Sequence, residues 1–219
     1  MILARVSKKQ HDPEPRKQAG TASAKALVDA VVEAAGALLV EVGLELTTND
    51  VARRAGVSVG SLYQYFPNKE AILAEATRRV NDSFLAQLEA IVDGPEEPTA
   101  KLDAVIDLAC SDRFGNLDLR RALFVNVPRS WTYTTIAAAE PEVLALLDRL
   151  VELLVASRTE QGLSIEPDAR SRISVAFFMV RGAVQGALLY DHAMLRENRL
   201  ANMLRPHVHA MLFGGAGVG

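Results

Sequence analysis

Helix start and stop signals crowded into one short stretch constrain the fold of this chain more than any other feature. The stretch reads TTNDVARRAGVSVGSLYQYFPNKEA, and its opening threonines and Asp50 fit the N-terminal cap of a helix. Gly56 ends that helix, Ser58 caps a second, and Pro67 forbids its continuation. Asn68 caps a third helix. The stretch therefore predicts two short helices joined by a tight turn and followed directly by the start of a longer one.

The rest of the chain also carries helical rather than strand patterns. Apolar residues recur at spacings of three and four over residues 21–42 and again from residue 68 to a break at Asp93-Gly94-Pro95. Alternation of apolar and polar residues is scarce, so an all-α fold is predicted. Further helices are expected at about 98–112, 117–127, 140–160, 167–191 and 197–213, with a joint from Pro128 to Thr135.

Four parts are expected along the chain. They are a flexible basic arm over residues 1–20, a three-helix domain over 21–70, a larger helical domain over 71–213 that is reached through the long helix, and a disordered tail over 214–219.

Charge is unevenly distributed over these parts. The net charge is −3, yet residues 1–70 hold nine Lys and Arg against eight Asp and Glu, and residues 1–25 hold six against two. A local basic end on an acidic protein indicates a polyanion partner for that end alone. The single cysteine, Cys110, fits a reducing compartment, and no stretch reaches the length of about 18 apolar residues of a membrane span. A cytoplasmic protein is expected.

The second short helix has one face that is unusual for a helix exposed only to water. Leu62 and Phe66 lie one turn apart and are expected to be buried, which turns Gly60, Ser61 and Gln64 outward. Tyr63 and Tyr65 are placed on the flanks. Small residues allow close approach to a surface, and a glutamine amide presents a donor and an acceptor together, as reading of base edges requires. A DNA-reading helix is predicted, although helix hairpins with a glycine turn also occur in proteins that do not bind DNA.

The segment GVSVGSLYQYFPNKEAI is very similar to the N-terminal signature of the TetR/AcrR family of bacterial transcription regulators. The similarity extends from about Lys25 to Leu73 and includes the threonines before the first short helix, the AGVS turn, the Tyr-x-Tyr-Phe ending and the Asn-Lys-Glu opening of the next helix. It implies a dimeric, ligand-responsive protein that binds a palindromic DNA operator, most often as a repressor.

Carried over position by position, the resemblance implies a set of DNA contacts. Thr48 would meet a phosphate and Asn49 a base, and Tyr65 and Lys69 resemble phosphate contacts. The recognition helix, capped by Ser58, would carry Val59, Gly60, Ser61, Tyr63 and Gln64. Val59 departs from the basic or polar residue of many relatives and offers methyl groups instead. Lys8, Lys9, Arg16 and Lys17 of the arm are either minor-groove contacts or part of a solvated tail.

The C-terminal domain is expected to dimerise and to bind the effector. The segment ISVAFFMVRGAVQGALLY is apolar nearly all round and contains small residues one turn apart, which favours close helix pairing. The predicted interface residues are Gly182, Gly186, Leu189, Leu204, Val208 and Leu212. The candidate lining residues for a small-molecule effector are Phe114, Phe124, Trp131, Tyr133, Phe178 and Met179, with Arg181 either meeting a ligand carboxylate or forming an internal salt bridge. The carboxylates Glu140 and Glu142 are assigned to a helix start.

No catalytic residues, metal or cofactor are predicted, because the four histidines are not placed together and no acid–base set converges. Two competing hypotheses remain open. One is a helical small-molecule-binding protein or enzyme whose hairpin is incidental, and the other is a DNA-binding protein without an effector.

Overall fold

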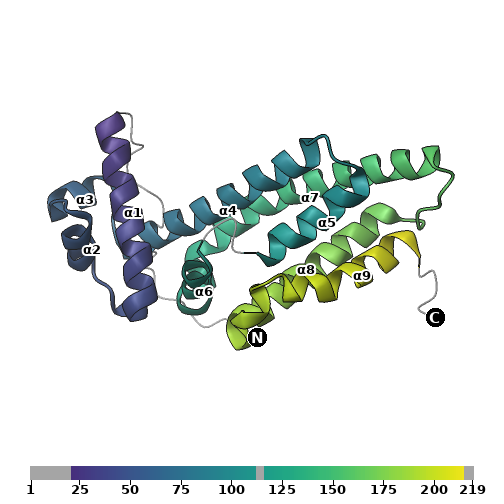
Figure 1. Cartoon of the computed structure of the whole chain (residues 1–219). Coiled ribbons are helices and arrows are strands. Elements are labelled where there is room, and N and C mark those ends of the chain that lie inside the picture. The colour runs from purple at the N-terminus through teal and green to yellow at the C-terminus, as the bar shows by residue number, and fades with distance from the viewer. Residues whose placement is uncertain (1–20, 112–115, 215–219) are drawn as a thin grey trace, which may run out of the picture. The chain divides into compact units, whose positions relative to one another are not determined.

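The computed structural model describes residues 21–111 and 116–214, with residues 132–136 described by their backbone alone. The described residues form α-helices, two short 3-10 helices and connecting turns, and no strand (Figure 1). The elements are α1 (Ala22–Val42), η1 (Gly43–Glu45), α2 (Thr48–Ala55), α3 (Val59–Tyr65), α4 (Lys69–Asp93), α5 (Pro98–Cys110), α6 (Leu117–Asn126), α7 (Arg129–Glu160), α8 (Ala169–Tyr190), η2 (His192–Leu195) and α9 (Arg199–Phe213). The predicted all-α class is confirmed. The arm and residues 215–219 lie outside the described residues.

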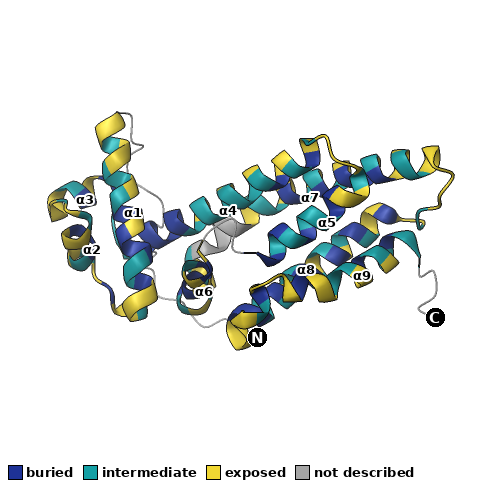
Figure 2. Ribbon diagram, in the orientation of Figure 1, coloured by how far each residue is buried: buried dark blue, intermediate teal, exposed yellow. Residues whose placement is uncertain are grey.

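The chain divides into two compact units, and the division differs from the predicted boundary at residue 70. The first unit extends to Thr77 and takes in Val127–Tyr133, while the second holds Arg78–Asn126 and the chain from Thr134 onward. The physical reason is burial, because the apolar side chains of the first two turns of α4 are enclosed (Figure 2). These buried residues are Ala71, Ile72, Leu73, Ala74 and Ala76.

The first unit encloses a core supplied by α1, α2, α3 and the first turns of α4. Its fully buried side chains include Leu39 on α1, Val51 on α2, Leu62 on α3 and Phe66 just beyond it. Burial of such side chains contributes roughly 1.5–3 kcal/mol each, which is what holds helices as short as α2 and α3 in place.

The second unit has its own core, in which α8 packs on α9, α5 and α6 and α5 packs on α9. Its fully buried side chains include Leu88 of α4, Leu102 of α5, Leu150 of α7 and Leu212 of α9. Cys110 is buried here as a free thiol.

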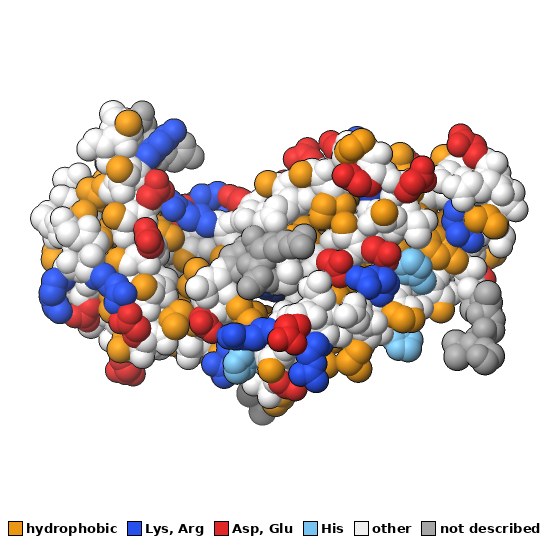
Figure 3. All heavy atoms as spheres, in the orientation of Figure 1, with side chains coloured by type: hydrophobic (Ala, Val, Ile, Leu, Met, Phe, Trp, Pro, Cys, Tyr) orange, Lys and Arg blue, Asp and Glu red, His pale blue; other side chains and the backbone are white. Residues whose placement is uncertain are grey.

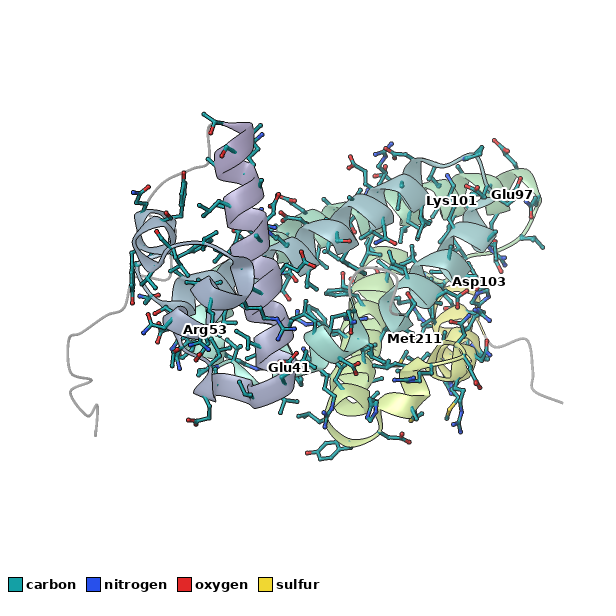
Figure 4. The ribbon with its side chains drawn as sticks, turned by 60° about the vertical axis from the view of Figure 1, so that its left-hand side comes forward. Glu41, Arg53, Glu97, Lys101, Asp103 and Met211 are labelled. Atoms are coloured by element: carbon teal, nitrogen blue, oxygen red, sulfur yellow. The ribbon has the colours of Figure 1, made fainter. Side chains whose placement is uncertain are left out.

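In three helices of the second unit, a carbonyl of the last turn accepts a hydrogen bond from a cationic side chain of another helix. Lys101 at the start of α5 donates to the Val92 carbonyl of α4 (2.9 Å), and Arg121 of α6 donates to the Leu188 carbonyl of α8 (3.2 Å). Arg172 of α8 donates to the Met211 carbonyl of α9 (2.9 Å). The labelled Lys101 lies beside the α4–α5 turn and Met211 lies on α9 (Figure 4). The last carbonyls of a helix have no partner within the helix, so these cations satisfy acceptors that carry negative partial charge.

Helix α7 corrects two expectations. It begins at Arg129 instead of 140, so the expected joint from Pro128 to Thr135 is largely helical, and it continues through Pro141. Glu140 is therefore not at a helix start. Its carboxylate lies 2.6 Å from the Arg181 guanidinium on α8, and the pair joins α7 to α8.

In the described part of the chain, α8 is long and apolar enough to cross a membrane by length and composition. Core helices of soluble proteins meet the same criterion, so α8 alone is weak evidence for a membrane span. One side of α8 contributes Ile173, Ala176, Val180 and Val184 to the core of the second unit.

Candidate nucleic-acid interface

A complete capping box begins α2. The Asp50 N–H donates to the Thr47 hydroxyl oxygen (3.2 Å), and the Thr47 N–H donates to the Asp50 carboxylate (3.2 Å). The Thr47 hydroxyl also donates to the Asp50 carboxylate (2.6 Å), and this bond, followed by that of the Thr47 N–H, is the main reason that the pKa of the Asp50 carboxyl lies below its ordinary value. The box fixes the backbone where Thr48 and Asn49 begin the helix.

The turn between α2 and α3 depends on one glycine and one serine. Gly56 adopts the left-handed conformation (φ 68°), and its N–H reaches the carbonyls of Ala52 and Arg53. Ser58 caps α3, since its hydroxyl accepts the Ser61 N–H (3.0 Å), and the two serine hydroxyls lie 2.8 Å apart. The turn places α3 against α2 and directs the start of α3 outward.

The outward residues of α3, which are Val59, Gly60, Tyr63 and Gln64, form the candidate face, and this face is open to solvent. Val59 is 37% exposed and Tyr63 40% exposed, and Gly60 and Gln64 are also exposed. A Cβ added at Gly60 would meet only the Ser58 hydroxyl, at 3.8 Å. The space in front of Gly60 is therefore free for an incoming surface.

A hydrogen bond joins the two helices of the hairpin on this side. The Thr48 hydroxyl at the start of α2 lies 2.9 Å from the Tyr63 hydroxyl of α3. Both hydroxyls are hydrogen-bonding groups suited to phosphate oxygens. The sequence predicted each residue as a contact but gave no sign that they meet, because they lie 15 positions apart.

Two predicted contacts are placed differently from expectation. Tyr65 is only 8% exposed, because it lies three positions after Leu62 and so on the same side of the helix, and its ring packs into the first unit instead of flanking the open face. Lys69 does not extend freely to solvent. Its ammonium donates to the carbonyls of Leu44 (2.7 Å) and Leu46 (3.5 Å).

The arginines of α2 are both paired. Arg53, whose side chain is 76% exposed, binds Asp50 (2.9 Å), and Arg54 binds Glu41 of α1 (2.7 Å). Basic and acidic side chains are accordingly interspersed on this part of the surface (Figure 3). The candidate face itself carries no acidic side chain, which leaves it compatible with a phosphate backbone.

The predicted effector residues do not share one kind of environment. Phe124 and Met179 pack against the core of the second unit, whereas Phe178 is 51% exposed and is therefore not an interior lining residue. Arg181 forms the internal ion pair with Glu140 that the sequence left open as one alternative. Trp131 is partly buried in the first unit, while Phe114 and the side chain of Tyr133 lie outside the described residues.

The predicted dimer residues also fall into two groups. Gly182 and Leu189 are exposed on α8, and a Cβ added at Gly182 or Gly186 would meet nothing within 4 Å. Val208 and Leu212 are 1% and 0% exposed in the core of their own chain, and Leu204 is half-buried. The expectation that Val208 and Leu212 face a partner is therefore corrected. Among the large apolar side chains of α9, that of Met203 is exposed, at 61%.

Taken together, the capped helix pair, the left-handed glycine turn and the open face of α3 define a helix-turn-helix protein with an all-helical C-terminal unit. Residues 31–76 match the family described as bacterial regulatory proteins, tetR family. The N-terminal helix-turn-helix domain belongs to this family, and the predicted TetR/AcrR resemblance is confirmed.

Curated relatives match about a third of the chain. The HTH-type transcriptional repressor KstR2 of Mycobacterium tuberculosis is 37% identical over 76 residues, which are 34% of this chain and 38% of that protein. The HTH-type transcriptional regulator BetI of Escherichia coli is 37% identical over 86 residues, covering 37% and 41% respectively. The chain thus matches about two fifths of the length of these relatives.

Solved structures show that the fold extends over most of the chain. The Bacillus subtilis transcriptional regulator FadR in complex with stearoyl-CoA aligns with a TM-score of 0.62 at 21% identity, over 87% of this chain and 98% of that one. The SmeT–triclosan complex aligns with a TM-score of 0.65 at 20% identity, over 87% and 93%. SmeT is the repressor of a Stenotrophomonas maltophilia multidrug efflux pump.

Proposed function

We propose that this protein is a ligand-responsive DNA-binding transcription regulator, a repressor that binds a palindromic operator as a homodimer. The observation that carries the proposal is the open face of α3, held by the capping box and the Gly56 turn and free of acidic side chains. Thr48, Asn49, Ser58, Val59, Gly60, Ser61, Tyr63 and Gln64 are the proposed contacts. The family of the N-terminal domain supports the same conclusion.

Dimerisation is supported by the two glycines in the middle of α8. Glycine inside a helix costs about 1 kcal/mol relative to alanine, and this chain gives no steric reason for Gly182 or Gly186. Val175, Phe178 and Leu189 lie exposed on the same helix at 56%, 51% and 44%. We infer that a second α8 packs across this face, with Met203 of α9 at its side. A twofold axis there would present two recognition helices to two half-sites.

A small-molecule effector of the second unit is proposed from the fold. Two structural neighbours are complexes with stearoyl-CoA and with triclosan, and each of these molecules has a large apolar part. Phe124 and Met179 remain the candidate contacts in this unit. We propose that effector binding selects a conformation in which the two recognition helices no longer fit successive grooves. A regulator of this kind works in the cytoplasm, and the relatives KstR2 and BetI are an HTH-type transcriptional repressor and an HTH-type transcriptional regulator.

Selection of bound sequences from a random pool of duplex DNA tests this function. We expect an enriched palindrome whose half-sites are related by the helical repeat of DNA. Gln64→Ala should relax the preference at one base pair of each half-site, a change of about 1–3 kcal/mol in discrimination. Gln161→Ala, which alters an exposed glutamine directly after α7, is the matched control and should leave the selected sequence unchanged. Failure to enrich any sequence at low salt would refute the proposal.

A further inference from the structure

Lys69 occupies a position that its own helix does not favour. It is the first residue of α4, directly after the Asn68 cap, whose side-chain oxygen accepts the Ala71 N–H (2.8 Å). The amino end of a helix carries positive partial charge, so a lysine there is repelled by the helix that holds it. A half-buried ammonium at this point needs acceptors from elsewhere.

Those acceptors come from the segment between α1 and α2. The Lys69 ammonium lies 2.7 Å from the Leu44 carbonyl and 3.5 Å from the Leu46 carbonyl, 25 and 23 positions earlier. Leu44 lies in η1, which continues from the carboxyl end of α1. Carbonyls at such an end lack helical partners and carry negative partial charge. The lysine therefore sits at the end of one helical segment that repels it and at the end of another that attracts it.

The same carbonyls immediately precede the DNA-facing helix α2. Leu46 is 1% exposed, so its side chain is fixed in the core while its carbonyl accepts from Lys69. The next residue, Thr47, makes the capping box, and Thr48 after it meets the Tyr63 hydroxyl. An unbroken series of contacts and bonds thus leads from the first residue of α4 to the hydroxyl pair of the candidate face.

We propose that Lys69 is a positioning residue, which ties the first turn of α4 to the segment entering α2 and so sets the Thr48–Tyr63 pair, and that it does not contact phosphate. This inference rests on the proposed DNA-binding function. It departs from the phosphate role expected by resemblance. The use of a cation to cap helix carbonyls recurs in this chain at Lys101, Arg121 and Arg172.

Amide hydrogen exchange in the free protein tests the tie without DNA. Lys69→Met keeps the length of the side chain and removes the donor, and we expect the amides of residues 47–52 to exchange on the order of tenfold faster, as the loss of a charged hydrogen bond implies. Lys25→Met is the matched control, because it removes the same charge from an exposed lysine of the same domain, on α1. It should leave the Leu46 carbonyl contact intact and exchange at these amides within about twofold of the parent.

The salt dependence of operator affinity distinguishes positioning from phosphate contact. Each phosphate contact contributes about 0.9 to the slope of log affinity against log salt. Lys69→Met should weaken binding on the order of tenfold with the slope unchanged. Lys69→Gln, which keeps an N–H donor without the charge, should recover part of both the affinity and the exchange protection.

Two results would overturn the inference. One is exchange of residues 47–52 unchanged by Lys69→Met, and the other is a slope reduced by about 0.9 for each subunit. If the protein bound no DNA at all, the proposed function would fail, and the exchange measurement would still decide whether Lys69 holds the start of α2. If Lys69→Met did not fold, Lys69→Gln would carry the same two measurements.

Discussion

At Gly60, one added methyl group is expected to affect the stability of the fold and the affinity for DNA in opposite directions. An added Cβ has room in the free protein, and alanine favours a helix over glycine by a few tenths to about 1 kcal/mol. We therefore expect Gly60→Ala to fold with equal or slightly greater stability in urea and yet to lose operator affinity in fluorescence anisotropy, because the methyl group lies where the DNA approaches. An affinity equal to that of the parent protein would remove Gly60 from the proposed interface.

The Tyr63 hydroxyl gives a second prediction at this scale. Tyr63→Phe removes the partner of the Thr48 hydroxyl, and one neutral hydrogen bond is worth about 0.5–1.5 kcal/mol, or roughly a twofold to tenfold loss of affinity. The salt slope should not change, since no charge is lost. Tyr190→Phe, which alters a tyrosine 89% exposed at the end of α8, is the control. Equal affinities of the two variants would argue against the proposed role of the pair.

Local residue patterns predicted the hairpin well and its long-range contacts poorly. Thr47, Gly56 and Ser58 act as the caps that their types and spacing predicted, because capping depends on residues within four positions. Tyr65 was misplaced on a helix of only seven residues, where a rotation of 60° separates a flank from the core. The acceptors of Lys69 lie more than 20 positions away, and no local pattern reports them.

At the scale of elements, one ion-pair cluster holds α9 on α5 (Figure 4). The Asp103 carboxylate lies 3.3 Å from Nε of Arg205 and 2.7 Å from Nε2 of His209, and Arg205 also reaches Asp107 at 2.5 Å. All four side chains are about one quarter to one third exposed, so solvent weakens each pair. The cluster nevertheless combines several contacts on one guanidinium.

Asp103→Asn should lower the free energy of unfolding by about 1 kcal/mol, because Arg205 and His209 lose the charge they share. Asp82→Asn removes one partner of an exposed pair within α4 and should cost less than about 0.5 kcal/mol. Urea denaturation followed by circular dichroism compares the two. A larger loss for Asp82→Asn would show that the α5–α9 cluster adds little.

Burial of Cys110 at the end of α5 predicts a dependence on alkaline pH. Burial, reinforced by the nearby Asp107, raises the pKa of the thiol to about 11 from its ordinary 9.0. The folded protein should therefore react slowly with a thiol reagent at pH 8 and rapidly once unfolded. Because the unfolded thiol ionises first, the contribution of Cys110 to stability is complete below pH 9 and declines as the pH rises towards 11. Rapid labelling of the native protein at pH 8 would contradict this burial.

Element boundaries were predictable where a helix ends on glycine or proline and failed where proline lies inside one. Helices α4, α5 and α6 end within about two residues of the expected positions. Helix α7 begins 11 residues before its expected start and passes through Pro141, since a long packed helix tolerates one missing N–H when tertiary contacts support it.

For the whole molecule, the exposed face of α8 predicts its state of association. Gly182→Arg adds a bulky charge where the chain itself leaves open space, so the monomer should fold normally. We expect the variant to sediment as a monomer and to lose cooperative binding to a two-half-site operator. Ala86→Arg makes a similar change on an exposed position of α4 and should remain dimeric. A dimeric Gly182→Arg would place the interface elsewhere.

The organisation of the whole chain was only partly readable from its sequence. An apolar stripe does not report whether it packs inside its own chain or against another, which is why Val208 and Leu212 were assigned to a partner and lie in their own core. The first turns of α4 were assigned beyond the helix-turn-helix domain, but their buried alanines and leucine belong to it.

In the proposed interface, Val59 would make DNA binding depend on the methyl groups that the major groove presents. Its two methyl groups lie on the outward side of α3, where they can sense only the shape and the apolar groups of the groove. The 5-methyl group of thymine provides such a feature, and so does that of 5-methylcytosine. Enzymatic methylation of cytosines within an operator would therefore change its affinity for this helix. Replacement of thymine by uracil would remove the methyl group that Val59 contacts.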